Sequence, residues 1–244
     1  MLTSLVGSEM CIRDRMFSKD ALKGQRILVT GGGSGLGKEM SRHFLKFGSE
    51  VVICGRRESV LEDTAKELSD ETGGVITYFP LDIRDSMAIE ASVEELFNEK
   101  PLTGLVNNAA GNFISRTKDL SPNGFNAIAS IVFHGTFYIT NAVGKRWIEN
   151  KQKGSIISIL ATWVWTGSPF VIPSAMSKSG INAMTKSLAV EWGQYGIRLN
   201  AIAPGPFPTE GAWSRLMPQT GDTKKDEKVT SQYMNIPLQR AGEM

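Results

Sequence analysis

The spacing of apolar residues constrains the fold of this chain more than any other feature. Short runs rich in β-branched residues alternate with longer stretches in which apolar residues recur at helical spacing. This alternation is typical of βαβ units, in which helices connect parallel strands and cover both faces of the sheet. We therefore predict an α/β fold with a doubly wound parallel sheet.

Six strands and five helices are predicted from this pattern. The strands are Arg26–Thr30, Val51–Cys54, Val75–Phe79, Gly104–Asn107, Ser155–Leu160 and Ile197–Ala203. The helices are Leu36–Phe47, Val60–Glu71, Ala88–Phe97, Gly124–Asn150 and Ser174–Tyr195. Because ligands of such sheets bind beyond the carboxyl ends of the strands, we expect the site in the loops that follow the strands.

Two motifs lie in those loops. Residues 30–37 read TGGGSGLG, and their glycines permit a tight turn, close approach of a pyrophosphate and close packing of the following helix. Residues 107–111 read NNAAG and follow the fourth strand. Together these motifs resemble the short-chain dehydrogenase/reductase family, which implies a Rossmann fold and an enzyme that transfers a hydride. The cofactor-binding residues implied by the resemblance are Thr30, Gly31, Ser34, Gly35, Leu36, Gly37, Asp82, Asn108, Lys178, Pro204, Gly205 and Pro206.

The residues after the second strand favour NADP(H) over NAD(H). An acidic side chain at this place would bind the ribose hydroxyls of NAD and repel a 2′-phosphate. The sequence has Arg56 and Arg57 instead, and guanidinium groups match a phosphate in charge and in geometry. The predicted cofactor is therefore NADP(H), unless both arginines are only solvated surface residues.

The catalytic motif departs from the common pattern of the family, which has an Asn, a Ser, a Tyr and a Lys. Lys178 is the only match. Ser174 stands where the tyrosine is expected, Ala161 at the serine and Val132 at the asparagine. The wider Tyr-Lys spacing of enoyl-acyl-carrier reductases falls on Val171. An ordinary ketoreductase is thus disfavoured.

A different branch, the NADPH-dependent 2,4-dienoyl-CoA reductases, is much more similar. The resemblance runs from about Arg26 to Pro218 and is most specific in residues 107–115, 173–178, 204–206 and 211–216. It implies an acyl-CoA substrate, in which Asn112 hydrogen-bonds the thioester oxygen while Ser174 and Lys178 hold the cofactor and the active-site network. The implied substrate contacts are Arg84, Phe113, Ser121 and Arg215.

The implied reaction explains why an asparagine can replace a proton-donating tyrosine. Hydride attack on the diene pushes negative charge onto the thioester oxygen, so the group beside that oxygen must stabilise charge more than it must release a proton. The branch has a second donor, a tyrosine, at the position of Trp163. Indole has one N–H donor and no acidic proton, so Trp163 is either a substitute donor or an aromatic lining of the acyl pocket.

The ends of the chain do not match the family pattern. Residues 1–15 have no clear period and resemble translated adapter sequence, so we expect a non-native or disordered extension and a single domain over residues 16–244. The family normally continues beyond the position of Met244 with a helix and a last strand, so the domain is expected to be truncated there, without its C-terminal strand.

Composition limits the possible partners. The net charge is +2 with no basic tract, and we expect neither nucleic acid nor a membrane as partner. His43 and His134 stand alone, so no metal site is predicted. Family analogy implies a homo-oligomer, a tetramer, in the cytoplasm of a bacterium, with mitochondria and peroxisomes as alternatives. Two other functions stay open: a related enoyl or carbonyl reductase, and an NADP-binding protein with little turnover.

Overall fold

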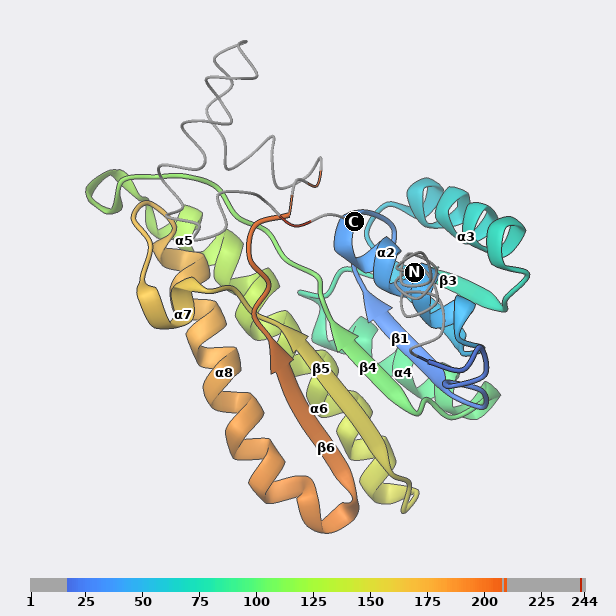
Figure 1. Ribbon diagram of the computed structural model, residues 1–244. Coiled ribbons are helices and arrows are strands. Elements are labelled where there is room, and N and C mark those ends of the chain that lie inside the picture. The colour runs from blue at the N-terminus through green and yellow to red at the C-terminus, as the bar shows by residue number, and fades with distance from the viewer. Residues whose placement is uncertain (1–16, 208, 210–241, 243–244) are drawn as a thin grey trace, which may run out of the picture.

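A single parallel sheet forms the centre of the molecule. The computed structural model describes residues 17–207, 209 and 242, so the predicted extension 1–15 lies outside the described residues. The strands follow the order β3-β2-β1-β4-β5-β6 and all pair in parallel (Figure 1). They are β1 (Arg26–Thr30), β2 (Glu50–Gly55), β3 (Ile76–Pro80), β4 (Gly104–Asn107), β5 (Gly154–Ile159) and β6 (Ile197–Ile202). The doubly wound prediction is confirmed.

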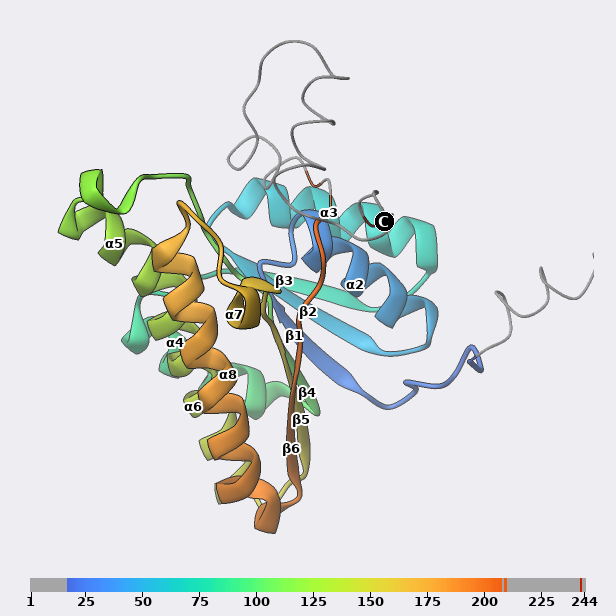
Figure 2. The same cartoon turned by 60° about the vertical axis from the view of Figure 1, so that its left-hand side comes forward.

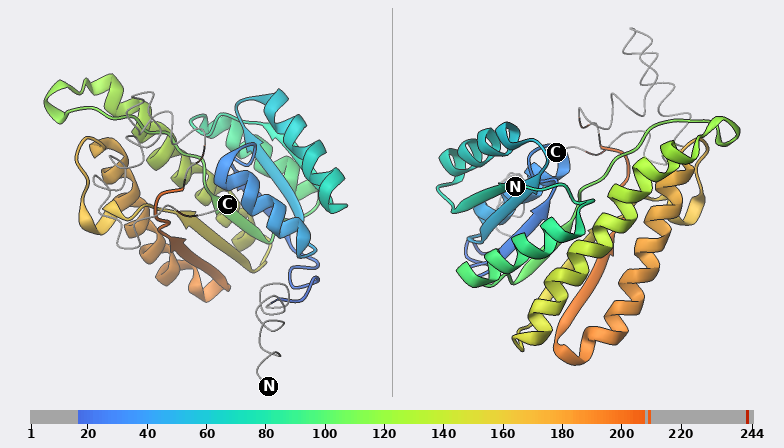
Figure 3. Two further views of the ribbon diagram at one scale, coloured as in Figure 1. Left: turned by 45° about the horizontal axis from the view of Figure 1, so that its top comes forward. Right: turned by 180° about the vertical axis from the view of Figure 1, so that it is seen from behind.

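Helices cover both faces of this sheet. They are α2 (Gly35–Lys46), α3 (Glu58–Thr72), α4 (Ser86–Glu99), α5 (Pro122–Ala129), α6 (Gly135–Glu149), α7 (Trp163–Thr166) and α8 (Ile172–Trp192). Figure 2 shows α2 and α3 on one face of the sheet and α4, α6 and α8 on the other, and Figure 3 shows the same layers from two further directions.

The alternation of side chains in β1 shows why two faces are buried. Ile27 and Val29 pack in the cluster beneath α2 and α3, whereas Leu28 packs in the cluster beneath α4, α6 and α8. Successive residues of a strand point to opposite faces, so the middle of a strand covered on both sides is apolar, and the polar residues at the ends of β1, Arg26 and Thr30, are hydrogen-bonded. All five residues of β1 are accordingly buried.

The long helix predicted over Gly124–Asn150 is not one regular helix. It begins at Pro122, and a π-helical turn at Ser130–His134 separates α5 from α6. Val132, inside this turn, is completely buried. A Cβ atom on Gly135 would lie 2.7 Å from the carbonyl oxygen of Ile83, so the chain approaches the loop after β3 closely where α6 begins. Apolar periodicity alone cannot reveal such a local change in hydrogen bonding.

The segment Pro122–Glu149 is also long and apolar enough to meet a simple criterion for a membrane span. Half of its most apolar stretch, however, is buried inside the fold. The core helix of a globular protein meets the same criterion, and the burial here shows that α6 packs as such a helix.

The last helix and its surroundings also differ in detail from the prediction. The helix expected over Ser174–Tyr195 begins two residues earlier, as α8 (Ile172–Trp192), and ends in a 3₁₀ turn, Gly193–Tyr195. The short helix α7 was not predicted. Its four residues are fewer than the helical period needs to become visible in a sequence.

Candidate active site

The glycine-rich turn brings the end of β1 against the loop after β4. Gly31 has φ +67°, and its N–H donates to the carbonyl of Cys54 at 2.8 Å. A Cβ atom on Gly31 would lie 3.1 Å from the Cα atom of Ala109. A Cβ atom on Gly37 would overlap the carbonyl oxygen of Gly31, so the first turn of α2 packs directly on the turn before it. Both positions therefore require glycine.

Thr30 and Asn108 hold these two loops together. The hydroxyl of Thr30 accepts from the backbone N–H groups of Asn108 and Ala109, each at 3.0 Å. The side-chain amide of Asn108 in turn donates to the carbonyl of Thr30 at 3.0 Å. Both residues were predicted to bind the cofactor. Within the protein they fix the shape of the turn that a cofactor would meet.

The N-terminus of α2 has no side-chain cap from the residue that precedes it, and Thr209 lies beside its first residue, Gly35. Ser34 precedes α2, makes no side-chain cap hydrogen bond, and is followed by a first turn without an acidic residue. Two helices on the other face of the sheet are capped, since Asp85 accepts from two N–H groups of α4 and Ser121 accepts from Gly124 in α5, whereas α3 and α8, like α2, have no side-chain cap. Free N–H groups and the helix dipole together make such a terminus suited to a phosphate.

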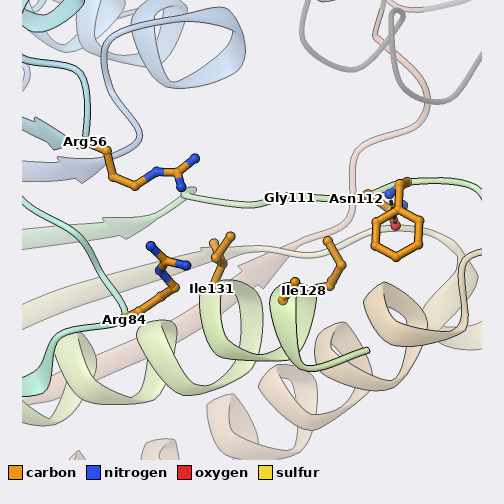
Figure 4. Close-up of a pocket in the computed structure, with 8 residues that line it drawn as sticks. Arg56, Arg84, Gly111, Asn112, Ile128 and Ile131 are labelled. Carbon is orange, nitrogen blue, oxygen red and sulfur yellow. Dashed lines mark hydrogen bonds between the residues drawn. The ribbon is translucent and has the colours of Figure 1, made fainter. Parts of the chain in front are cut away.

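A cavity of about 460 Å³ lies at the carboxyl edge of the sheet. Figure 4 shows the guanidinium groups of Arg56 and Arg84 near one end and Asn112 at the other. Between them, apolar side chains of α5 and the π-helical turn face the space. The residues that line it are Arg56, Arg84, Gly111, Asn112, Phe113, Ala127, Ile128 and Ile131. The cavity thus joins a cationic end, an apolar wall and a carboxamide.

Several predicted residues meet in this cavity and others do not. Arg56 and Arg57 are both exposed, but only Arg56 lines it. Phe113 lines it, and Ser121 is the exposed cap of α5. Pro204, Gly205 and Pro206 follow the carboxyl end of β6. Arg215 lies outside the described residues.

Ile128 and Ile131 were missed in the sequence analysis. Their spacing of three residues along an apolar helix was a usable signal for a face turned toward the site.

Asp82 and Arg84 form an ion pair with each other. Arg84 Nε donates to both carboxylate oxygens of Asp82, at 2.9 and 3.0 Å. This hydrogen bonding lowers the pKa of Asp82, and the positive charge of Arg56 lowers it further. Each of the two was predicted to contact a different ligand, so their pairing was not anticipated.

Lys178 lies in the interior with its charge poorly solvated. Its Nζ donates to the carbonyl of Ile159, at the end of β5, and 6% of the residue is exposed. Burial lowers the pKa of Lys178 to about 8. Ser174, one helical turn earlier in α8, is also buried, with 3% exposed. The helix therefore presents both predicted residues inward at the end of β5.

Asn112 and Trp163 each have a buried polar atom without a partner, a property that four other side chains of the described residues share, namely Ser49, Asn107, Arg146 and Gln152. Asn112 Nδ2 and Trp163 Nε1 are both buried and have no hydrogen-bond partner. The amide oxygen of Asn112 accepts from the N–H of Phe113 at 3.0 Å, which fixes the amide group. An unpaired buried donor costs about 1–3 kcal/mol, so donors left in this state are expected where a ligand supplies the acceptor.

Comparisons with known proteins agree with this arrangement. The sequence model of the family described as short chain dehydrogenase matches residues 25–219. The chain belongs to the short-chain dehydrogenase family. It is therefore an oxidoreductase of a family that uses NAD(H) or NADP(H).

The relatives found by sequence are similar along most of the chain. A probable 2,4-dienoyl-CoA reductase 3 from Caenorhabditis elegans is 46% identical over 212 residues, which is 85% of this chain and 68% of the relative. A probable 2,4-dienoyl-CoA reductase from Bacillus subtilis is 40% identical and covers 88% of this chain and 83% of its own. Among solved structures, a short chain dehydrogenase from Bacillus anthracis is 43% identical, with a TM-score of 0.77 over 91% of this chain and 85% of its own.

Proposed function

We propose that this protein reduces 2,4-dienoyl-CoA thioesters with NADPH. The names of the relatives support the substrate class. The observation that carries the proposal is the pair of buried N–H donors without partners, Asn112 Nδ2 and Trp163 Nε1. A dienoyl thioester gains negative charge on its carbonyl oxygen when the diene is reduced, and that oxygen, seated at the Asn112 end of the cavity, would supply the acceptor that Asn112 Nδ2 lacks. Trp163 would be the second donor, at the position of the tyrosine that the dienoyl-CoA reductases have.

The residues around the glycine-rich turn fit a dinucleotide phosphate. The uncapped terminus of α2 offers N–H groups to the pyrophosphate, and Arg56 offers a cation to the 2′-phosphate. Lys178, one turn after Ser174, would bind the nicotinamide ribose. NADPH, when bound, supplies the hydride for the reduction. Within the proposed cofactor site, Arg57 has the smaller part, since it lies outside the cavity lining.

The cavity fits an acyl-CoA in charge and shape. The phosphates of CoA would lie at its cationic end, at Arg84 and beside the Arg56 assigned to the cofactor, and the thioester would lie at Asn112. Phe113 and Ile128 would contact the apolar parts of the substrate. Asn112 holds the thioester oxygen in place, because its own amide oxygen is fixed by Phe113 N–H.

Replacement of Asn112 by alanine tests the proposal. Loss of one oxyanion donor typically lowers kcat roughly 10²–10³-fold, and we expect this for Asn112→Ala with a 2,4-dienoyl-CoA, while the Kd for NADPH stays the same. Stopped-flow oxidation of NADPH and a fluorescence titration measure the two quantities. A wild-type protein that binds NADPH but reduces no dienoyl-CoA would refute the proposal.

Trp163 is tested by two substitutions that differ in donor strength. Trp163→Tyr supplies a phenol, which is a better donor to a developing oxyanion, and should raise kcat. Trp163→Phe removes the donor and should lower it. The control is Trp165→Phe, since Trp165 is 64% exposed on the same short helix. Equal kcat values for the Tyr and Phe variants of Trp163 would show that the indole only lines the pocket.

A further inference from the structure

Phe170 has an unusual backbone conformation. Among the described residues, Lys151 and Phe170 are the two non-glycine residues with positive φ, at +54° and +67°. Lys151 lies in the turn between α6 and β5, at the end of the sheet opposite the site. Phe170 lies between α7 and α8, on the side of the site. For a bulky aromatic residue this region is strained, and such strain persists where the surrounding structure imposes it.

A hydrogen bond ties Phe170 to the loop that carries Asn112. The N–H of Ser115 donates to the carbonyl of Phe170 at 2.9 Å. This bond connects the loop after β4 to the loop before α8. The ring of Phe170 is 43% exposed, and Ile114, beside Ser115, is 49% exposed. A large apolar side chain with a strained backbone thus lies at the surface beside this loop, although burial would be favourable for it.

The direction of the cavity indicates what could cover this surface. Arg56 and Arg84 mark one end of the cavity and Asn112 marks the other (Figure 4). A thioester held at Asn112 with its CoA phosphates at Arg84 would extend its acyl chain past Asn112, on the side away from that arginine. The protein chain beyond Asn112 runs through Phe113 and Ile114 to Ser115, which is bonded to Phe170.

We propose that Phe170 determines acyl-chain length in this enzyme by contacting the distal methylene groups of the substrate. This inference rests on the proposed function, because it takes the occupant to be the acyl chain of a dienoyl-CoA. Long chains reach the ring and remove apolar surface of both partners from water, whereas short chains end before it. The ring thus favours the binding of long-chain substrates over short-chain ones.

The test compares Phe170→Ala, Phe170→Gly and the control Lys151→Gly in the full chain. Both glycine variants relieve a positive φ, but only the Phe170 variants remove the ring. We measure kcat/KM for 2,4-hexadienoyl-CoA and 2,4-decadienoyl-CoA. We expect the long-to-short ratio of kcat/KM to fall about tenfold in both Phe170 variants, within the range that small changes in apolar contact produce, and to stay constant in Lys151→Gly.

Calorimetric binding of the saturated esters hexanoyl-CoA and decanoyl-CoA gives a second readout that does not need turnover. We expect the preference for decanoyl-CoA to fall by a similar factor in both Phe170 variants. An unchanged long-to-short ratio, or an equal loss for both chain lengths, would overturn the assignment to Phe170. The proposed reaction, and not the role of Phe170, would be refuted if the wild-type enzyme reduced neither dienoyl-CoA but still bound decanoyl-CoA more tightly than hexanoyl-CoA.

Discussion

Replacement of Lys178 by methionine should stabilise the protein near neutral pH. Burial lowers the pKa of this lysine from 10.5 to about 8. Each pKa unit corresponds to about 1.36 kcal/mol, so the buried ammonium destabilises the native state by about 3 kcal/mol at pH 7. Methionine has similar volume and no charge, and therefore avoids this cost.

The pH dependence separates this effect from simple changes in packing. Below pH 8 Lys178 is charged in both the native and the unfolded state, so the cost of burying the charge is fully present. As the pH rises from about 8 to 10.5, the native lysine loses its proton while the unfolded lysine keeps it, and the cost disappears. The stability advantage of Lys178→Met over wild type should thus be roughly 2 kcal/mol larger at pH 7 than at pH 10.

Urea unfolding at both pH values, followed by tryptophan fluorescence, measures this difference. Loss of the bond to the Ile159 carbonyl adds a contribution of its own to each value, so the change between the two pH values is the informative quantity. Lys186→Met is the control, because Lys186 is exposed on the same helix, and its effect should be equal at both pH values. An equal effect of Lys178→Met at pH 7 and pH 10 would refute the argument from burial.

Two further predictions concern the cofactor site. Arg56→Ala should weaken NADPH binding roughly tenfold or more, since a hydrogen bond to a charged group contributes about 1.5–3 kcal/mol. Arg57→Ala should weaken it less, and the affinity for NADH should change in neither variant. A greater loss of NADPH affinity in Arg57→Ala than in Arg56→Ala, measured in parallel titrations, would contradict the geometry. Gly37→Ala should lower the thermal midpoint and NADPH affinity, because the added methyl group would overlap the Gly31 carbonyl and overpacking costs roughly 1–3 kcal/mol. Gly193→Ala, with nothing within 4 Å of its Cβ position, is the matched control in calorimetry, and equal midpoints for the two variants would disprove the clash.

The sheet was predictable because its signal is repeated along the chain. The strands at the centre of the sheet are apolar on both sides, β6 at its edge alternates between apolar and polar residues, and the predicted bounds of all six strands agree with the observed ones to within one residue. Parallel strands also bring the loops after β1 and β4 to one edge, so Gly31 and Asn108 could be placed together before any contact was known.

The partners of individual side chains were not predictable in this way. Thr30 and Asn108 bond to each other's loops, and Asp82 pairs with Arg84, because side chains choose partners according to the final loop conformations. The cavity wall at Ile128 and Ile131 depends on the π-helical turn, which no short apolar pattern specifies. The sequence pointed to the donors Asn112 and Trp163 through family resemblance, and only the structure revealed that both lack a partner.

The π-helical turn at Ser130–His134 makes the structure sensitive to the number of residues between α5 and α6. Before it, Ile128 faces the cavity; after it, Ala142 and Trp147 face the core. A residue advances an α-helix by about 100° around its axis, so deletion of one residue from the turn would rotate α6 by about that angle relative to α5. Either the cavity wall or the packing on the sheet would then be lost. The ring of Phe133 also packs on Gly180 of α8, so the length of this segment sets a third contact as well.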